Sequence, residues 1–533
     1  MTNDIKHFIR SRIEADVASG KTPKVVLRFP PEPNGYLHLG HVKSIVLNSS
    51  LAELFDGELN LRFDDTNPAK ESSEYVVAIE RDARWVSDRF NRVLWTSDYF
   101  DTIYRCAVHL IHKGLAYVDD STPEEMKAAR GDFGHVGTNS PCRDRSIAAN
   151  LALFERMRNG DFEDGARVLR ARIDMASPNM SMRDPVLYRI SHTEHHNTGD
   201  RWCIYPLYDF AHPISDALEG ITHSLCTLEF EDHRPLYDWV VDACYEVLGH
   251  RPVQIEFARL EAEGVVLSKR KLNALVTDGK VNGWDDPVMP TVAGLRRRGY
   301  PAEVLREFVM RCGFGKANSV VSLATLDDAV CDVLGPNVDR RMGVLDPVEL
   351  VIENLPEPLN VRVPNHPKDA ARGDRALTLT PSVWVERADV RLEASADFWR
   401  LAPGNWVRLK HGLNVLVRAV EADESGRVLR VVAEADLPST DMKAARWKAK
   451  AVLHWLSDAD SKEAHVVRYD GLFNDEGEFN SSAARSITAR VERNLSTETH
   501  YEFERVGYIW SDESGKLHFL APVKGPKPAK SGK

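Results

Sequence analysis

The stretch from residue 25 to residue 65 constrains the fold more than any other part of this chain. Residues 25–29 form a mostly apolar run, which predicts a strand buried on both faces. Residues 30–35 contain three prolines and a glycine, so they predict a loop, and a largely buried helix is expected to begin near His38. Residues 59–63 alternate between apolar and polar, which predicts a second strand. The order strand, loop, helix, strand is typical of a doubly wound nucleotide-binding sheet.

Two short segments carry chemistry. His38 and His41 flank Gly40 at the expected helix start, where backbone N–H groups and the helix dipole favour an anion such as a phosphate. A histidine pair that only caps the helix is the competing interpretation. Residues 266–271 include Lys269 in a cationic loop that could clamp a pyrophosphate, and a solvated basic loop is the alternative there.

The alternation of predicted strands and helices is interrupted between residues 100 and 200. This stretch is rich in Arg, Gly, Pro and Asn, which predicts an insertion with its own fold. The α/β pattern is expected to resume near residues 204–206. Helical spacing then dominates residues 285–334, where Leu305 and Phe308 fall three apart.

The sequence pattern changes from helical spacing to short strands beyond Val338. Residues 405–410, 414–420 and 427–433 read as short strands at regular spacing, which predicts all-β barrels. The tail from Lys524 is rich in Lys, Pro, Gly and Ser and is expected to be disordered.

Composition excludes several classes of protein. The 533 residues leave room for three to five domains. We recognise no signal peptide and no apolar run as long as a membrane span. We therefore expect a cytoplasmic protein without a membrane partner. The net charge of −11 argues mildly against a nucleic-acid partner, although basic clusters occur at 296–298 and 340–341. Seven scattered cysteines, none in C-x-x-C spacing, indicate reduced thiols.

Two groups of residues could suggest sites that we do not expect. The first group, His192, Glu194, His195 and His196, has no Cys or second cluster in ligand spacing. We therefore interpret these residues as surface or structural and predict no metal site. The tryptophans of the predicted barrels could stack on bases, but core packing is the commoner fate; they are Trp384, Trp399, Trp406, Trp447 and Trp455.

Taken together, His38–His41 and residues 266–271 resemble the HIGH and KMSKS signatures of class I aminoacyl-tRNA synthetases, with a leucine in place of one apolar residue in each. The resemblance becomes more specific over four longer stretches and runs from about residue 5 to residue 510. These stretches look like glutaminyl-tRNA synthetase: Arg28 to His41, Phe63 to Pro68, Ser215 to Phe230 and Val266 to Leu272.

The resemblance implies a division into domains that combines α/β and β architecture. A Rossmann-type catalytic domain would comprise residues 1–95 and 206–262, interrupted by an inserted domain for the tRNA acceptor end at 96–205. A helical connecting subdomain with the KMSKS-like loop would follow at 263–337. The C-terminal part would contain a proximal anticodon-binding β-barrel at 338–441 and 505–522, a distal one at 442–504, and a disordered tail at 523–533.

The resemblance also implies roles for individual residues, with His38, His41 and Lys269 as the catalytic ones. The ATP site would contain Glu32, Pro33, Asn34, His38, Leu39, Gly40, His41, Val42, Lys43, Ser44, Thr227, Arg259, Leu260, Leu267, Ser268 and Lys269. The glutamine site would contain Asp64 at the α-ammonium and Tyr208 at the side chain, with Arg28, Gln254 and Cys226 in the same pocket. Candidate tRNA contacts are Asp232, Arg340, Arg341, Arg408 and Lys410.

The implied reaction joins L-glutamine to tRNA(Gln) through a glutaminyl adenylate, with ATP as substrate. Mg²⁺ would come with ATP and need no dedicated protein site. The 2′-hydroxyl of the terminal adenosine would attack the adenylate, and the protein is expected to be a monomer.

Two alternatives remain at this point. A glutamyl-tRNA synthetase of the archaeal and eukaryotic type would need a positive charge near the γ-carboxylate, and that family typically has an arginine where this chain has Cys226. A catalytically retired, tRNA-binding paralogue would not need the polar residues that both signatures keep. Both observations favour a glutamine enzyme.

Overall fold

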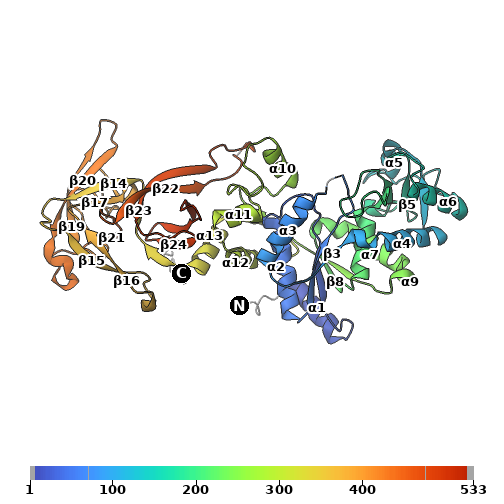
Figure 1. Ribbon diagram of the computed structural model, residues 1–533, viewed down its shortest axis with the longest axis horizontal. Coiled ribbons are helices and arrows are strands. Elements are labelled where there is room, and N and C mark those ends of the chain that lie inside the picture. Colours follow the sequence, from blue (N-terminus) through green and yellow to red (C-terminus); the bar gives the residue numbers. More distant parts are fainter. Residues whose placement is uncertain (1–6, 70, 475, 525–533) are drawn as a thin grey trace.

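The computed structural model describes residues 7–69, 71–474 and 476–524. The molecule is elongated, with the N-terminal α/β elements and the inserted domain towards one end and two β-sheet domains towards the other (Figure 1). No helix in the described part of the chain is long and apolar enough to cross a bilayer.

The N-terminal α/β domain is built on parallel strands. In one sheet β2 lies between β1 and β3, and β8 pairs with β9. β8 runs next to β1, because the Thr222 N–H donates to the Val26 carbonyl at 3.0 Å. The strands are β1 (Val26–Phe29), β2 (Glu58–Phe63), β3 (Phe90–Trp95), β8 (His223–Thr227) and β9 (Val253–Phe257). The βαβ unit predicted from the sequence is confirmed.

Helix α2 (Leu39–Leu54) connects β1 to β2 and begins at the predicted place, with His38 as its N-cap. Its buried residues lie on most of its circumference, which matches the expected burial. The other helices of this domain are α1 (Phe8–Ala18), α3 (Ser73–Val86), α7 (Tyr208–Leu218), α8 (Arg234–Ala243) and α9 (Tyr245–Leu248).

The inserted segment forms its own antiparallel sheet in the order β4-β5-β6-β7. Its elements are α4 (Phe100–His112), β4 (Ala116–Asp119), α5 (Pro123–Arg130), α6 (Ile147–Arg158), β5 (Val168–Ala171), β6 (Val186–Ile190) and β7 (Ile204–Pro206). The expectation that the α/β pattern resumes at residues 204–206 is wrong, because this run pairs with β6. A short apolar run does not reveal its partner, and the α/β pattern resumes at α7.

A helical region follows the catalytic sheet. It contains β10 (Glu261–Ala262), α10 (Lys269–Thr277), α11 (Val292–Arg298), α12 (Ala302–Cys312), β11 (Val320–Val321) and α13 (Ala324–Leu334). Leu305 and Phe308 are fully buried on α12, as the helical spacing predicted, and α12 packs against α2. One core therefore joins this region to the nucleotide-binding sheet.

The C-terminal part contains two large sheets, and its predicted partition is wrong. The seven-stranded sheet contains β12 (Asp339–Arg341), β13 (Gly343–Leu345), β22 (Ser461–Tyr469), β23 (Ala484–Glu492), β24 (Thr499–Phe503), β25 (Gly507–Ser511) and β26 (Leu517–Pro522). The six-stranded sheet contains β14 (Pro347–Ile352), β17 (Ser382–Glu386), β18 (Trp406–Leu409), β19 (Asn414–Ala422), β20 (Val428–Asp436) and β21 (Ala451–Leu453), and β15 (Leu359–Pro364) pairs with β16 (Asp374–Leu379).

Residues 505–522 therefore belong with 461–504 and with the short strands β12 and β13, and not with the six-stranded sheet of residues 347–453. The seven-stranded sheet is the one next to the helical region, since the Tyr300 hydroxyl donates to the Leu520 carbonyl, whereas β19 and β20 lie at the far end (Figure 1). The three strands predicted at 405–433 are confirmed as β18, β19 and β20. The predicted tail at 523–533 lies largely outside the described residues; within it, Lys524 pairs with Asp332 at 2.6 Å.

Candidate active site

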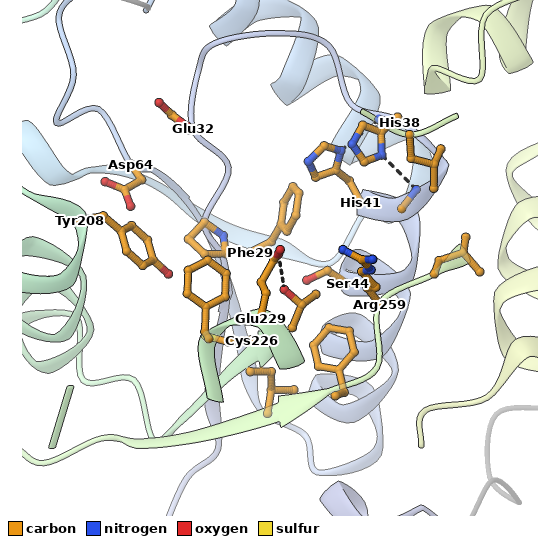
Figure 2. Close-up of a pocket in the computed structure, with 18 of the residues that line it drawn as sticks. Phe29, Glu32, His38, His41, Ser44, Asp64, Tyr208, Cys226, Glu229 and Arg259 are labelled. Atoms are coloured by element: carbon orange, nitrogen blue, oxygen red, sulfur yellow. Dashed lines mark hydrogen bonds between the residues drawn. The ribbon is translucent and has the colours of Figure 1, made fainter. Parts of the chain in front are cut away.

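A cavity of about 1060 Å³ opens at the carboxyl ends of the catalytic strands. Phe29, Asp64 and Thr227 line it, and each lies at or just beyond the end of its strand (Figure 2). In sheets of this kind ligands bind at that edge. The N-terminus of α2 closes one side, where His38, Gly40, His41 and Ser44 line the wall.

His38 and His41 form a capping box at the start of α2. The Gly40 N–H donates to His38 Nδ1 at 3.1 Å, and the His38 N–H donates to His41 Nδ1 at 3.0 Å. Since Nδ1 is an acceptor in both rings, the Nε2 atoms carry the protons. Burial, together with the Lys269 ammonium, lowers the pKa of His38 to about 3, and burial lowers the pKa of His41 well below its ordinary value. Both rings are therefore neutral N–H donors at pH 7.

Lys269 reaches this site from a segment distant in the sequence. It is the first residue of α10, and its ammonium donates to Asn34 Oδ1 at 2.5 Å. Burial lowers its pKa, which the carboxylate of Glu32 opposes. The KMSKS-like loop is thus attached to the proline-rich loop, and the cation stands beside the two histidines.

Asp64 is the most unusual group in the cavity. It is 4% exposed, and no described group hydrogen-bonds to either of its carboxylate oxygens. Burial raises the pKa of Asp64 to about 7, although Arg62 opposes the rise. A buried carboxylate without a partner is costly unless a ligand supplies the cation.

Tyr208 and Cys226 line the cavity on the same side as Asp64 (Figure 2). Burial raises the pKa of the Tyr208 phenol and of the Cys226 thiol, so both stay protonated at pH 7. The phenol can donate to or accept from a carboxamide, whereas the thiol offers no charge to a carboxylate.

Arg28 lies behind this wall rather than in it. Its guanidinium is fully buried, donates to Asp216 at 3.1 Å and to the Ser224 hydroxyl at 2.6 Å, and lies 3.5 Å from the Cys226 sulfur. Burial would raise the pKa of Asp216, but Arg28, His212 and Arg62 hold it well below its ordinary value. The positive charge of Arg28 is therefore compensated within the core.

Ten of the predicted ATP-site residues line the cavity: Glu32, His38, Gly40, His41, Ser44, Thr227, Arg259, Leu260, Leu267 and Ser268. Asn34 and Lys269 stand next to it through their mutual hydrogen bond, and Pro33 belongs to the same loop. Leu39, Val42 and Lys43 are buried on α2 and do not line the cavity; the Lys43 ammonium is close to Cys312. Gln254 likewise lies behind the wall, donating to the Phe230 carbonyl at 3.2 Å.

Sequence reasoning missed several residues of the cavity. Phe29 and Phe257 end catalytic strands, and Arg189 enters from the inserted domain. Position at a strand end was a usable signal for the two phenylalanines. Nothing local in the sequence predicts that Arg189, on β6, reaches a cavity of another domain.

The predicted tRNA contacts fall into two groups, Asp232 by itself and four cations of the C-terminal part. Asp232 is exposed, and its carbonyl accepts from Asn179 of the inserted domain at 2.8 Å. Arg340 pairs with Glu502, Arg341 with Asp339, and Lys410 with Glu504. The guanidinium of Arg408 donates to neutral oxygens of Asn414, Ser439 and Gly412. These four cations lie on the β-sheet domains.

One group of side chains near the cavity has ligand-like spacing: Asp65, His195 and His196. His195 Nε2 lies 2.7 Å from the Asp65 carbonyl, and its Nδ1 accepts from the Asn197 and Thr198 N–H groups. Both nitrogens of this ring are used within the protein, so we assign His195 a structural role.

The sequence matches three family models. Residues 24–332 match the catalytic domain of class I tRNA synthetases (E and Q), and residues 338–436 and 452–512 match anticodon-binding domains of the same class. A glutamate tRNA ligase structure from Elizabethkingia meningosepticum superposes with a TM-score of 0.44 at 19% identity, covering 59% of this chain and 70% of that one.

Curated relatives are similar over almost the whole chain. A glutamine–tRNA ligase of an Enterobacter strain is 48% identical over 95% of this chain and 94% of its own length. A glutamine–tRNA ligase of Salmonella paratyphi B is 51% identical over 88% of this chain and 85% of its own. The histidine pair, the lysine loop and the strand-end carboxylate thus occur in a chain that belongs to the glutamine–tRNA ligase family of class I tRNA synthetases.

Proposed function

We propose that the protein is a glutamine–tRNA ligase that converts ATP, L-glutamine and tRNA(Gln) into glutaminyl-tRNA(Gln), AMP and diphosphate. One observation carries the proposal. The unpaired, buried carboxylate of Asp64 shares a cavity with two neutral histidine donors, and Lys269 stands beside these histidines. An amino acid with its α-ammonium at Asp64 can therefore meet ATP with its phosphates at α2.

The first step needs no protein nucleophile. The α-carboxylate of glutamine attacks the α-phosphorus of ATP, and the bond to the β-phosphate oxygen breaks to release pyrophosphate. His38 and His41 donate Nε2–H to phosphate oxygens, and Lys269 meets the charge that grows on the departing pyrophosphate. In the second step the 2′-hydroxyl of the terminal adenosine attacks the adenylate carbonyl and releases AMP.

Mg²⁺ fits this site only as a companion of ATP. The groups at the start of α2 are imidazole N–H donors and an ammonium, which suit phosphate oxygens and not a cation. The ion would shield the negative charge of the phosphates while these residues orient them.

The test is exchange of labelled pyrophosphate into ATP. We expect exchange that requires both L-glutamine and cognate tRNA, the second requirement being carried over from the family resemblance. Absence of glutamine-dependent exchange in the presence of tRNA and Mg²⁺ would refute the function. Strong exchange without RNA would remove only the tRNA requirement. A monomeric state and a cytoplasmic location remain predictions. The seven free cysteines support the cytoplasmic location.

Replacing Cys226 by arginine should narrow the preference for glutamine over glutamate. Glutamate and glutamine are nearly isosteric, so charge must separate them, and a carboxylate next to a neutral thiol loses hydration without gaining a partner. The new guanidinium would supply that partner. We do not expect inversion, since the buried Arg28 lies 3.5 Å from the thiol and would repel a second cation.

The measurement is the ratio of kcat/KM for the two amino acids in competitive charging of one tRNA. Cys226→Ser, neutral and of similar size, is the matched control and should keep the parent ratio. If Cys226→Arg leaves this ratio unchanged, Cys226 does not line the pocket for the amino-acid side chain. A parent enzyme that prefers glutamate would contradict the glutamine assignment itself.

A further inference from the structure

Two tryptophans stack on the surface of the six-stranded sheet. The rings of Trp406 and Trp447 lie 5.7 Å apart between centroids and are inclined by 15°. Trp447 is 56% exposed, whereas Trp455 in the same domain is fully buried. Core packing, the interpretation from sequence, therefore holds for Trp455 and fails for Trp447. The exposed face of this stack is a flat aromatic surface of the kind on which a nucleobase can stack.

Hydrogen bonds anchor the backbone of both tryptophans to neighbouring residues. The Asn414 side-chain N–H donates to the Trp447 carbonyl at 2.8 Å, and the same amide accepts from Arg408 at 3.1 Å. The Lys450 N–H donates to the Trp406 carbonyl at 3.4 Å. Asn414 thus connects Trp447 directly to Arg408, one of the residues predicted to contact tRNA.

The surroundings of the stack are positively charged, in contrast to the chain as a whole. Four exposed cations lie within four residues of Trp447: Lys443, Arg446, Lys448 and Lys450. On β18 the buried Val407 and Leu409 alternate with Trp406 and Arg408, so the side chains of Trp406 and Arg408 share the outer face of the strand. The net charge of −11 makes this concentration of cations distinctive.

We propose that the Trp406–Trp447 stack, with its flanking cations, is a platform for one unstacked nucleobase of the single-stranded anticodon loop. Bases that are free of pairing stack on aromatic side chains, and nearby cations hold the phosphates. Trp447 lies in the segment 437–451, between the two matched anticodon-binding domains. The proposal rests on the proposed function, because it names the part of tRNA that this surface takes.

The test compares binding of a full-length tRNA(Gln) transcript with binding of an acceptor minihelix that lacks the anticodon arm. Trp447→Leu keeps an apolar side chain but removes the aromatic face, so we expect the Kd for full-length tRNA to rise about 5- to 100-fold. Trp447→Phe keeps a stacking ring and should recover most of the affinity. The Kd for the minihelix should not change in either variant. Leu429→Ala, at a 58% exposed site on β20, is the control for a general surface effect.

Salt dependence separates stacking from charge. Trp447→Leu should leave the slope of log Kd against log salt unchanged, because a stacking contact releases no counterion. Lys448→Ala should reduce that slope by about one. The platform would be overturned if Trp447→Leu left the Kd for full-length tRNA unchanged. It would also be overturned if Trp447→Phe lost as much affinity for full-length tRNA as Trp447→Leu. Failure of the parent protein to bind tRNA or to charge it would instead overturn the proposed function.

Discussion

Replacement of Lys269 by alanine is expected to lower the rate of adenylate formation by about 10²- to 10³-fold, the usual loss for a donor that stabilises developing charge. The ammonium stands beside His38 and His41 and is held by Asn34. Because negative charge grows on the leaving pyrophosphate only as the bond breaks, the loss should appear mainly in kcat and much less in the KM for ATP. The measurement is single-turnover adenylate formation at saturating ATP and glutamine.

Arg270→Ala is the matched control, because Arg270 is the next residue of the same helix and its side chain is exposed. We expect this variant to keep the parent rate. The Kd for tRNA should stay nearly unchanged in both variants. If tRNA binding collapsed in Lys269→Ala while adenylation survived, the role assigned to Lys269 would be wrong.

Replacement of Asp64 by asparagine is expected to have two opposite effects, a loss of function and a gain in stability. The variant keeps the shape but loses the charge opposite the α-ammonium, so the KM for glutamine should rise about 10²-fold. The free protein should become more stable by roughly 2–4 kcal/mol above pH 8, because the unpaired buried charge is removed.

The pH dependence of the parent protein follows from the same residue. The pKa of Asp64 is about 7 in the folded protein and about 4 in an unfolded chain. Between these values the folded state binds more protons, so this group lowers stability as pH rises from about 4 to about 7. The ionised form is the one that binds an ammonium, so the KM for glutamine should fall over pH 6 to 8.

Thermal unfolding of parent and variant without ligands, at pH 5 and pH 8, tests the stability effect. At pH 5 both side chains are neutral, and the two melting temperatures should nearly coincide. At pH 8 the asparagine variant should melt higher. An unchanged KM for glutamine would remove Asp64 from the site, and equal melting temperatures at pH 8 would show that its carboxylate finds a partner.

Local patterns predicted the part of the fold that carries the proposed ATP site. The strand at 25–29, the helix start at His38 and the second strand were each set by the spacing of apolar residues and by prolines, and each is confirmed. Five of the ten predicted ATP residues that line the cavity follow one another along that loop and helix; the other five lie between residues 227 and 268, and the family resemblance supplied them. Their roles remain predictions.

Long-range pairing could not be predicted in this way. Arg28 meets Asp216 across 188 positions, and neither residue has a neighbour that marks it as one half of a buried pair. The same holds for β25 and β26, whose sequence reads as strands but does not say which sheet they join. The exposed Trp447 and the buried Trp455 differ only in what the fold places around them.

The position of β8 next to β1 has a consequence for synthesis of the chain on the ribosome. Between the end of β3 and the start of β8, about 130 residues of the inserted domain and α7 must emerge first. At about 5–20 residues per second, the completed β1–β2–β3 sheet keeps one side of β1 without its neighbour for roughly 6 to 26 s. An open strand edge is a template for pairing with other chains. The inserted domain has its own sheet and can fold in this interval, before β8 closes the open edge.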